Sequence, residues 1–94
     1  MRLDLFLKLS RVCARRSIAQ KLCDAGLVLL NQRPVKPAHP VRAGDIIAVR
    51  RPDRETEFRV LIVPEARNVS KLDAKDLIEV LAEKRFEPVD PLDL

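Results

Sequence analysis

Two segments near the start of the chain carry apolar residues at the spacing of a helix. The first set begins with Leu3, Phe6 and Leu7, and an apolar residue every three or four positions marks one face of a helix. This pattern predicts a helix over residues 3–11. A second helix is predicted over residues 15–25 from Ile18, Ala19, Leu22, Cys23 and Ala25. The side chains expected to pack against a sheet are Leu3, Phe6, Leu7, Ile18 and Leu22.

Short apolar runs separated by turn residues follow the two predicted helices. Gly26 stands where the second helix would end in the left-handed conformation. Asn31 and Gln32 form the first predicted turn. Gln32 costs on the order of 1 kcal/mol there, because the second position of a primed turn favours glycine. The predicted strands cover residues 27–30, 33–36, 46–49 and 58–63, with a polar connector at 50–56.

The last part of the chain carries a further helical pattern. Ser70 and Asp73 are spaced as a capping box with Asp in place of Glu. The apolar residues that follow, which predict a helix over residues 71–85, are Leu77, Ile78 and Leu81. Residues 87–94 hold two prolines and three acidic residues and are predicted to fray.

Charge divides the 94 residues into two parts of opposite sign. Residues 1–54 carry 12 basic and 4 acidic residues, a net charge of +8. Residues 55–94 carry 6 basic and 10 acidic residues, a net charge of −4. A length of this order is typical of one small domain, and the asymmetry indicates that the first part binds a polyanion.

Composition argues against several classes of protein. Phe6, Phe58 and Phe86 are the only aromatic residues, which disfavours RNA modules that stack bases on aromatic platforms. Two cysteines and one histidine are fewer than the four ligands of a structural zinc site. Gly26 and Gly44 are the only glycines, so there is no glycine-rich phosphate loop. We expect no cofactor, no metal, no signal peptide, no membrane span and a cytoplasmic location.

Five basic residues and no acidic residue lie between Asp4 and Asp24. Arg15 and Arg16 fall in the first turn of the predicted second helix, where each cation opposes the helix dipole by about 0.3–1 kcal/mol. No capping residue immediately precedes them, and broken local rules tend to mark functional sites. We interpret the run as a phosphate-binding surface, with a solvated basic face as the alternative. Its members are Lys8, Arg11, Arg15, Arg16 and Lys21.

Other candidate residues carry weaker signals. Arg33, Lys36 and Arg42 form either a second wall of the same basic surface or ordinary loop charge. Cys13 could be a thiol activated by the neighbouring arginines, but the absence of a base favours a small buried core residue. Cys23 is expected in the core and His39 in an exposed loop, without a catalytic role.

An ordered set of motifs over residues 2–50 resembles the S4 RNA-binding domain. It consists of Arg2-Leu3-Asp4, Phe6-Leu7-Lys8, Ser10-Arg11, Arg15-Arg16, Ala19, Gly26, Val28, Asn31, Val35-Lys36 and Gly44-Asp45. The resemblance implies an α+β module of two helices with a small antiparallel or mixed sheet, followed here by a C-terminal helix. It adds Arg2 to the RNA-binding residues. Leu5, Ala14 and Gln32 depart from the family, whose members often carry Lys, a capping Ser or Thr, and Gly there.

The second part of the chain narrows the resemblance. Phe58–Val63, followed by Asn68-Val69-Ser70-Lys71 and Asp73-Ala74, is similar to the short bacterial RqcP family, a relative of the fifteen-kilodalton heat-shock protein. The resemblance implies a non-enzymatic factor on large ribosomal subunits obstructed by peptidyl-tRNA. It would contact ribosomal RNA and tRNA, support tailing of the stalled chain by a partner tailing factor, and be monomeric off the ribosome.

This reading divides the chain into an S4-type RNA-binding domain at 1–65 and a C-terminal helix with an acidic tail at 66–94. Two alternatives stay open. S4 domains often precede pseudouridine synthase or methyltransferase domains, so the chain could be an accessory fragment of an RNA-modifying enzyme. It could also be a protein–protein adaptor whose acidic helix face consists of Asp73, Asp76, Glu79 and Glu83.

Overall fold

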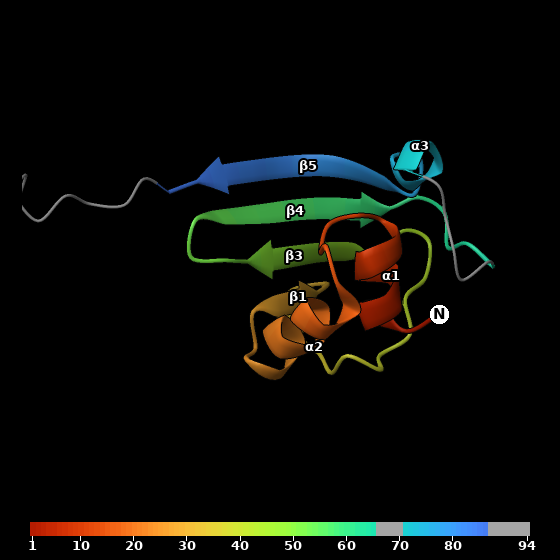
Figure 1. Cartoon of the computed structure of the whole chain (residues 1–94). Helices are drawn as coiled ribbons and strands as arrows, with labels where there is room; N and C mark the ends of the chain where they lie inside the picture. The colour runs from red at the N-terminus through yellow and green to blue at the C-terminus, as the bar shows by residue number, and fades with distance from the viewer. Residues whose placement is uncertain (66–70, 87–94) are drawn as a thin grey trace, which may run out of the picture.

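The computed structural model describes residues 1–65 and 71–86, in which two helices pack on one face of a five-stranded antiparallel sheet (Figure 1). The strand order is β2-β1-β3-β4-β5. The elements are α1 (Leu3–Leu9), α2 (Arg16–Asp24), β1 (Val28–Leu30), β2 (Arg33–Pro34), β3 (Ile46–Arg50), β4 (Arg54–Val60), α3 (Lys71–Ala74) and β5 (Ile78–Arg85). The α+β class and the two N-terminal helices are confirmed.

Helix α1 is capped by a distant loop rather than by a side chain. The backbone N–H groups of Leu3 and Asp4 donate to the carbonyls of His39 and Pro37, at 2.9 and 3.1 Å. The N–H of Val41 donates in turn to the carbonyl of Met1 at 2.9 Å. Since the first N–H groups of a helix lack partners within it, the loop supplies the missing acceptors and fixes the start of α1.

Helix α2 ends as the sequence predicts. Gly26 has a φ of +75°, the left-handed conformation that glycine adopts without a steric penalty. The N–H of Leu27 donates to the carbonyl of Leu22, and the N–H of Gly26 donates to that of Cys23, at 2.9 and 3.0 Å. These two bonds form a Schellman motif, which turns the chain directly into β1.

The β1–β2 hairpin also follows the prediction, including its unfavourable residue. Asn31 and Gln32 have φ angles of 50° and 72°, and Leu30 pairs with Arg33 across the turn. Two successive positive φ angles are the signature of a type I′ turn. Gln32 therefore occupies a left-handed position at which a Cβ is disfavoured.

The core lies between the helices and one face of the sheet, and it corrects one expected contact. Leu3, Phe6 and Leu7 are fully buried, as predicted. Ile18 is 41% exposed, whereas Ala19 is fully buried. Successive helical residues point about 100° apart, so α2 turns its small Ala19 and Cys23 side chains to the core and leaves Ile18 outside; Leu22 is partly buried.

The predicted C-terminal helix is wrong over most of its length. Helix α3 covers only Lys71–Ala74, and residues 78–85 form β5, which pairs antiparallel with β4. Leu77 is 4% exposed but Leu81 is 37% exposed, so the two leucines do not share a buried helix face. Pairing with the open edge of β4 overrides the helical spacing. The predicted cap residue Ser70 and the tail 87–94 lie outside the described residues.

The β3–β4 hairpin is longer than predicted. Strand β4 begins at Arg54 rather than at residue 58, and β3 extends to Arg50. The connector expected at 50–56 is therefore a tight turn, in which the N–H of Arg51 donates to the carbonyl of Arg54 at 2.8 Å. Strands β4 and β5 extend well past the two helices (Figure 1).

No helix among residues 1–65 and 71–86 is long and apolar enough to cross a membrane.

Candidate nucleic-acid interface

The predicted basic surface is organised around one buried carboxylate, Asp4. The Arg2 guanidinium donates to Asp4 through Nε at 3.1 Å and Nη2 at 3.2 Å. Arg16 Nε and Gln20 Nε2 donate to Asp4 Oδ2 at 3.1 and 2.9 Å, and the N–H of Leu5 donates to Oδ1 at 2.8 Å. Asp4 thus joins the start of α1 to the first turns of α2.

This network keeps Asp4 ionised. Burial alone would raise the pKa of the Asp4 carboxyl, but hydrogen bonds from Gln20, Arg16, the Leu5 N–H and Arg2 outweigh burial and hold the pKa below its ordinary value. Asp4 itself is buried, whereas the side chains of Arg2 and Arg16 are 49% and 41% exposed. One negative charge against two positive charges leaves a net charge of +1 at the surface.

The pairing changes the predicted role of Arg16. Arg16 uses Nε for Asp4, so its charge is shared with this protein's own carboxylate rather than fully available to RNA. The two Nη groups at the end of the fork have no partner within the described residues. The bond from Nε to Asp4 therefore fixes the orientation of the Arg16 side chain, and the two Nη groups can still bind a phosphate.

The start of α2 has the uncapped, cationic character predicted from the sequence. Arg15 is the N-cap residue, no side chain caps the helix, and its first turn contains no acidic residue. Arg15 is exposed and forms no ion pair within residues 1–65 and 71–86. The positive end of the helix dipole adds to the charge of Arg15 and Arg16, which makes this helix end suited to an anion.

The loop between α1 and α2 carries Arg11 and is held by a residue that the sequence did not indicate. Arg11 is exposed with a φ of 65°. Arg51 Nη2 donates to the Val12 carbonyl and lies 3.5 Å from Cys13 Sγ. Cys13 is fully buried, and burial raises the pKa of its thiol against the opposing effect of Arg51. The prediction that Cys13 is a core residue is confirmed.

The remaining candidate residues lie at separate places in the fold. Lys8 is on α1 and Lys21 is in the last turn of α2, and both are exposed. Cys23 is buried, and burial raises its pKa to about 11, with smaller contributions from Asp4, Cys13 and Asp24. His39 is exposed, and its Nδ1 lies 2.9 Å from the Pro40 carbonyl oxygen.

Arg33 lies on β2, Lys36 and Arg42 lie in the segment between β2 and β3, and all three are exposed. Their side chains form no ion pair with the described residues. Asn31 Nδ2 donates to Asp45 Oδ1 at 3.2 Å, and the N–H of Arg42 donates to Asp45 Oδ2 at 2.8 Å. These bonds connect the hairpin next to Arg33 with the turn that carries Arg42, so the structure brings these two loops together.

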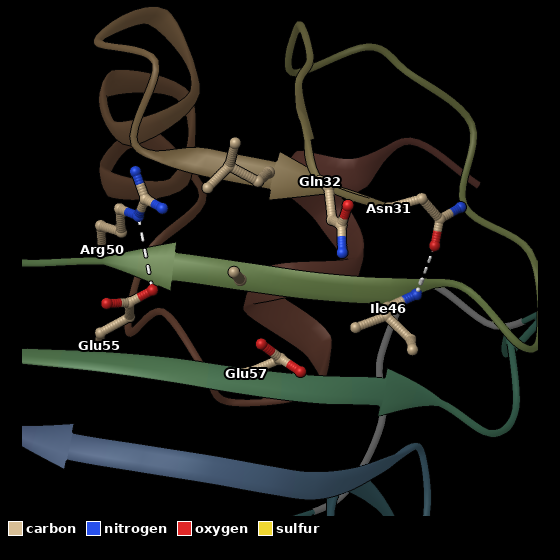
Figure 2. A pocket seen from close by; sticks show the side chains of 8 residues that line it. Asn31, Gln32, Ile46, Arg50, Glu55 and Glu57 are labelled. Atoms are coloured by element: carbon tan, nitrogen blue, oxygen red, sulfur yellow. Dashed lines mark hydrogen bonds and ion pairs between the residues drawn. The ribbon is translucent and has the colours of Figure 1, made fainter.

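A concavity of about 370 Å³ lies outside this basic surface (Figure 2). Its lining residues alternate along β1 and β3 with residues buried under the helices, so it belongs to the opposite face of the sheet. None of the nine predicted basic residues lines it, and its only cation, Arg50, pairs with Glu55 at 3.4 Å. The lining residues are Leu29, Asn31, Gln32, Ile46, Ala48, Arg50, Glu55 and Glu57.

Sequence reasoning missed Asp4, Gln20 and Arg51 as parts of the site. Asp4 lies in the first turn of α1, where an acidic residue suits the helix dipole and so gives no sign of a further role. It is, however, the only acidic residue among the first 23, and an acid alone in a basic segment is the signal that could have found it. Gln20 and Arg51 act through contacts with residues 16 and 38 positions away, for which the sequence carried no local signal.

Two helices packed on an antiparallel sheet, with arginines at the start of the second helix, define the S4-domain class, and residues 1–47 match the family model of the S4 domain. The chain is 35% identical over 89 residues to the RQC P-site tRNA stabilizing factor of Halalkalibacterium halodurans, covering 95% of this chain and 96% of that protein. It therefore belongs to the family of RQC P-site tRNA stabilizing factors, the RqcP family.

Further relatives and solved structures agree with this assignment. The chain is 31% identical over 87 residues to the factor of the same name from Listeria innocua, covering 93% of this chain and 92% of that protein. The trimeric structure of Vibrio cholerae Heat Shock Protein 15 superposes with a TM-score of 0.77 at 28% identity, covering 87% and 82% of the two chains. A solution structure of a hypothetical protein gives 0.76 at 32% identity, covering 87% and 98%.

Proposed function

We propose that this protein is a non-enzymatic RNA-binding factor that binds the large ribosomal subunit and stabilises P-site tRNA in ribosome-associated quality control. The observation that carries the proposal is the match to stabilizing factors of that name over nearly the whole chain. A factor that acts on ribosomes would be located in the cytoplasm. The specific partners proposed are ribosomal RNA, peptidyl-tRNA on the obstructed subunit, and a tailing factor that extends the stalled chain.

The structure suggests how the chain would bind RNA. The proposed interface is centred on the start of α2, where Arg15 and Arg16 stand beside uncapped backbone. Double-stranded RNA is recognised mainly through its shape, phosphates and 2′-hydroxyls, because its major groove is too narrow for side chains. Guanidinium groups fixed at a helix end suit that task, and the remaining interface residues proposed are Arg2, Lys8, Arg11, Lys21, Arg33, Lys36 and Arg42.

All nine of these residues lie in residues 1–65, which we propose as the RNA-binding domain, followed by a second region at 66–94.

The structure does not support the alternative of an acidic adaptor surface, because the four acidic residues proposed for it do not share a helix face. Glu79 and Glu83 lie on β5, opposite Arg59 and Thr56 respectively. No observation favours the alternative of a fragment of an RNA-modifying enzyme.

The interface is tested by salt-dependent binding to ribosomal RNA. Arg15→Ala and Arg16→Ala should each weaken binding and flatten the slope of log K against log salt by about one phosphate contact. Arg15→Ala is the cleaner variant, because Arg15 forms no ion pair within the described residues. Lys75→Ala, at an exposed position after α3, is the control. Unchanged affinity and slope in both arginine variants would contradict the interface.

The ribosomal assignment has a separate test. Tagged protein should sediment through a sucrose gradient with large subunits that carry peptidyl-tRNA, and Arg15→Ala should shift part of it to the top of the gradient. Wild-type protein that remains at the top even at low salt would contradict the proposed function while leaving RNA binding as such unaffected.

A further inference from the structure

Strand β5 forms one edge of the sheet (Figure 1). It is eight residues long, pairs with β4 on its inner side, and has no strand on its outer side among the described residues. Every residue from Glu79 to Phe86 is exposed, and Val80 is 55% exposed. The opposite edge, β2, is only two residues long and contains a proline. A long unpaired edge offers backbone donors and acceptors to another strand.

The side chains of β5 are distributed symmetrically about the middle of the strand. Glu79 and Lys84 lie opposite Arg59 and Glu55, on the face away from the helices. Val80 and Glu83 lie opposite Phe58 and Thr56, on the face toward the helices. This pattern is possible because a bulge gives β5 one extra residue, Leu81, opposite the Glu57–Phe58 step.

Because of the bulge, side chains at equal distances from the middle of β5 point to the same face of the sheet, whichever end of the strand one counts from. Counting outward from the midpoint between Leu81 and Ala82, equivalent positions lie on the same face: 80 with 83, 79 with 84, and 78 with 85. Residues directly opposite each other in an antiparallel pair must share a face. A second β5 running antiparallel, with Glu79 opposite Lys84 of the second copy, satisfies this condition along the strand.

Charge selects the same register. On the face away from the helices, Arg50 pairs with Glu55, and Glu55 lies opposite Lys84. In the second copy, Glu79 pairs with Arg59 at 3.2 Å. In the register described above, the charged side chains of the two copies form one continuous row across the dimer. Its members, in order, are Arg50, Glu55 and Lys84 of one copy, followed by Glu79 and Arg59 of the second copy. Signs alternate along the whole row, and opposite charges directly across a sheet are stabilising.

We propose that the free protein forms a two-fold symmetric dimer through antiparallel β5–β5 pairing, which joins two five-stranded sheets into one sheet of ten strands. Charged side chains usually protect a sheet edge because a second copy presents like charges. Here the reversal of the strand brings unlike charges together, so the same residues favour pairing. The inference does not depend on the proposed function, and it differs from the expectation of a monomer off the ribosome, which the sedimentation experiment below tests.

Sedimentation equilibrium of the free protein from low-micromolar to near-millimolar concentration is the first test. The average mass should rise from 10.7 kDa toward twice that value. Glu79→Lys and Lys84→Glu should each remain at 10.7 kDa, since each variant places like charges opposite each other twice. Asp76→Lys and Lys75→Glu make the same charge changes at exposed positions outside β5 and should dimerise like the wild type.

Mixing the two variants identifies the register. A Glu79→Lys chain and a Lys84→Glu chain have unlike charges at both contacts, so an equimolar mixture should recover the mass of a dimer. Each chain keeps its own internal contacts in the mixture, so a folding defect cannot produce this recovery. The proposal is overturned if the wild type stays monomeric, if the variants dimerise alone, or if the mixture stays monomeric while the wild type dimerises.

Discussion

At the scale of single residues, the candidate site depends on a buried acid more than on any one base. The sequence predicted the nine cations from charge and motif, since charge is visible without a fold. It could not predict that Arg2 and Arg16 share Asp4, because that contact needs α1 and α2 to be docked. The consequence is that a variant at Asp4 alters the orientation of two cations at once.

Asp4→Asn should destabilise the protein by about 1–3 kcal/mol, since it weakens hydrogen bonds between charged groups at a buried position. Because the pKa of Asp4 is lowered in the folded protein, its contribution is complete above the ordinary carboxyl pKa and is lost as the pH falls through the lowered value. Chemical unfolding from neutral to acidic pH should show this loss in the wild type and not in Asp4→Asn. Asp24→Asn, at an exposed position, is the control and should keep the wild-type pH dependence.

Gln32→Gly should stabilise the protein by roughly 0.5–1 kcal/mol, because it removes a Cβ from a left-handed position. Gln32 has a φ of 72° and is exposed at the rim of the concavity on the sheet, so little packing is lost. Ala38→Gly, in an exposed loop without positive φ, should instead lower stability. Thermal unfolding midpoints that move in the same direction for both variants would contradict this explanation.

At the scale of elements, the sequence predicted correctly those features that are set by neighbouring residues, and it failed where the conformation depends on contacts between distant segments. Helix α2 ends at a glycine, and the β1–β2 turn is set by two adjacent residues, so both could be predicted from neighbours in sequence. Strand β5 could not, because only Leu77, just before it, and the partly buried Ile78 contribute to the core, whereas its residues from Glu79 onward are exposed. Its conformation is set by pairing with β4, a contact between segments that are distant in sequence.

A pair of leucine variants distinguishes the strand from the helix that the spacing suggested. Leu77→Ala should cost about 2–3 kcal/mol of unfolding free energy, because Leu77 is buried. Leu81→Ala should cost less than about 1 kcal/mol, because Leu81 is 37% exposed and lies outside the core. On a helix the two residues would lie on one face and cost similar amounts. Equal losses in denaturant unfolding would therefore favour the helix over β5.

At the scale of the whole molecule, charge is distributed by layer. Four of the described carboxylates of residues 55–86 lie on β4 and β5, whereas five of the nine proposed RNA-binding cations lie on the two helices or at their N-caps. Paired residues such as Arg50–Glu55 and Arg59–Glu79 cover the sheet face away from the helices (Figure 2 shows the first pair). That face is nearly balanced in charge, so RNA would be attracted to the helical side.

The variant Arg42→Gln tests whether one RNA contacts two sets of cations at once. The first set is at the start of α2, with Arg15 and Arg16, and the second consists of Arg33, Lys36 and Arg42. Alone, it should flatten the salt slope of ribosomal RNA binding by about one, as Arg15→Gln should. The double variant should flatten the slope by about two, because distant contacts to the same RNA add. A double variant with the slope of Arg15→Gln alone would assign Arg42 to ordinary loop charge.

The contact of Arg51 with Val12 and Cys13 has a consequence for the order of assembly. The loop that carries Arg11 is held by a residue 38 or 39 positions later in the chain. During synthesis, the first two helices are therefore complete well before the residue that fixes the connection between them has been added. The contact that holds this loop can therefore form only after the chain has been made as far as the turn between β3 and β4, which carries Arg51.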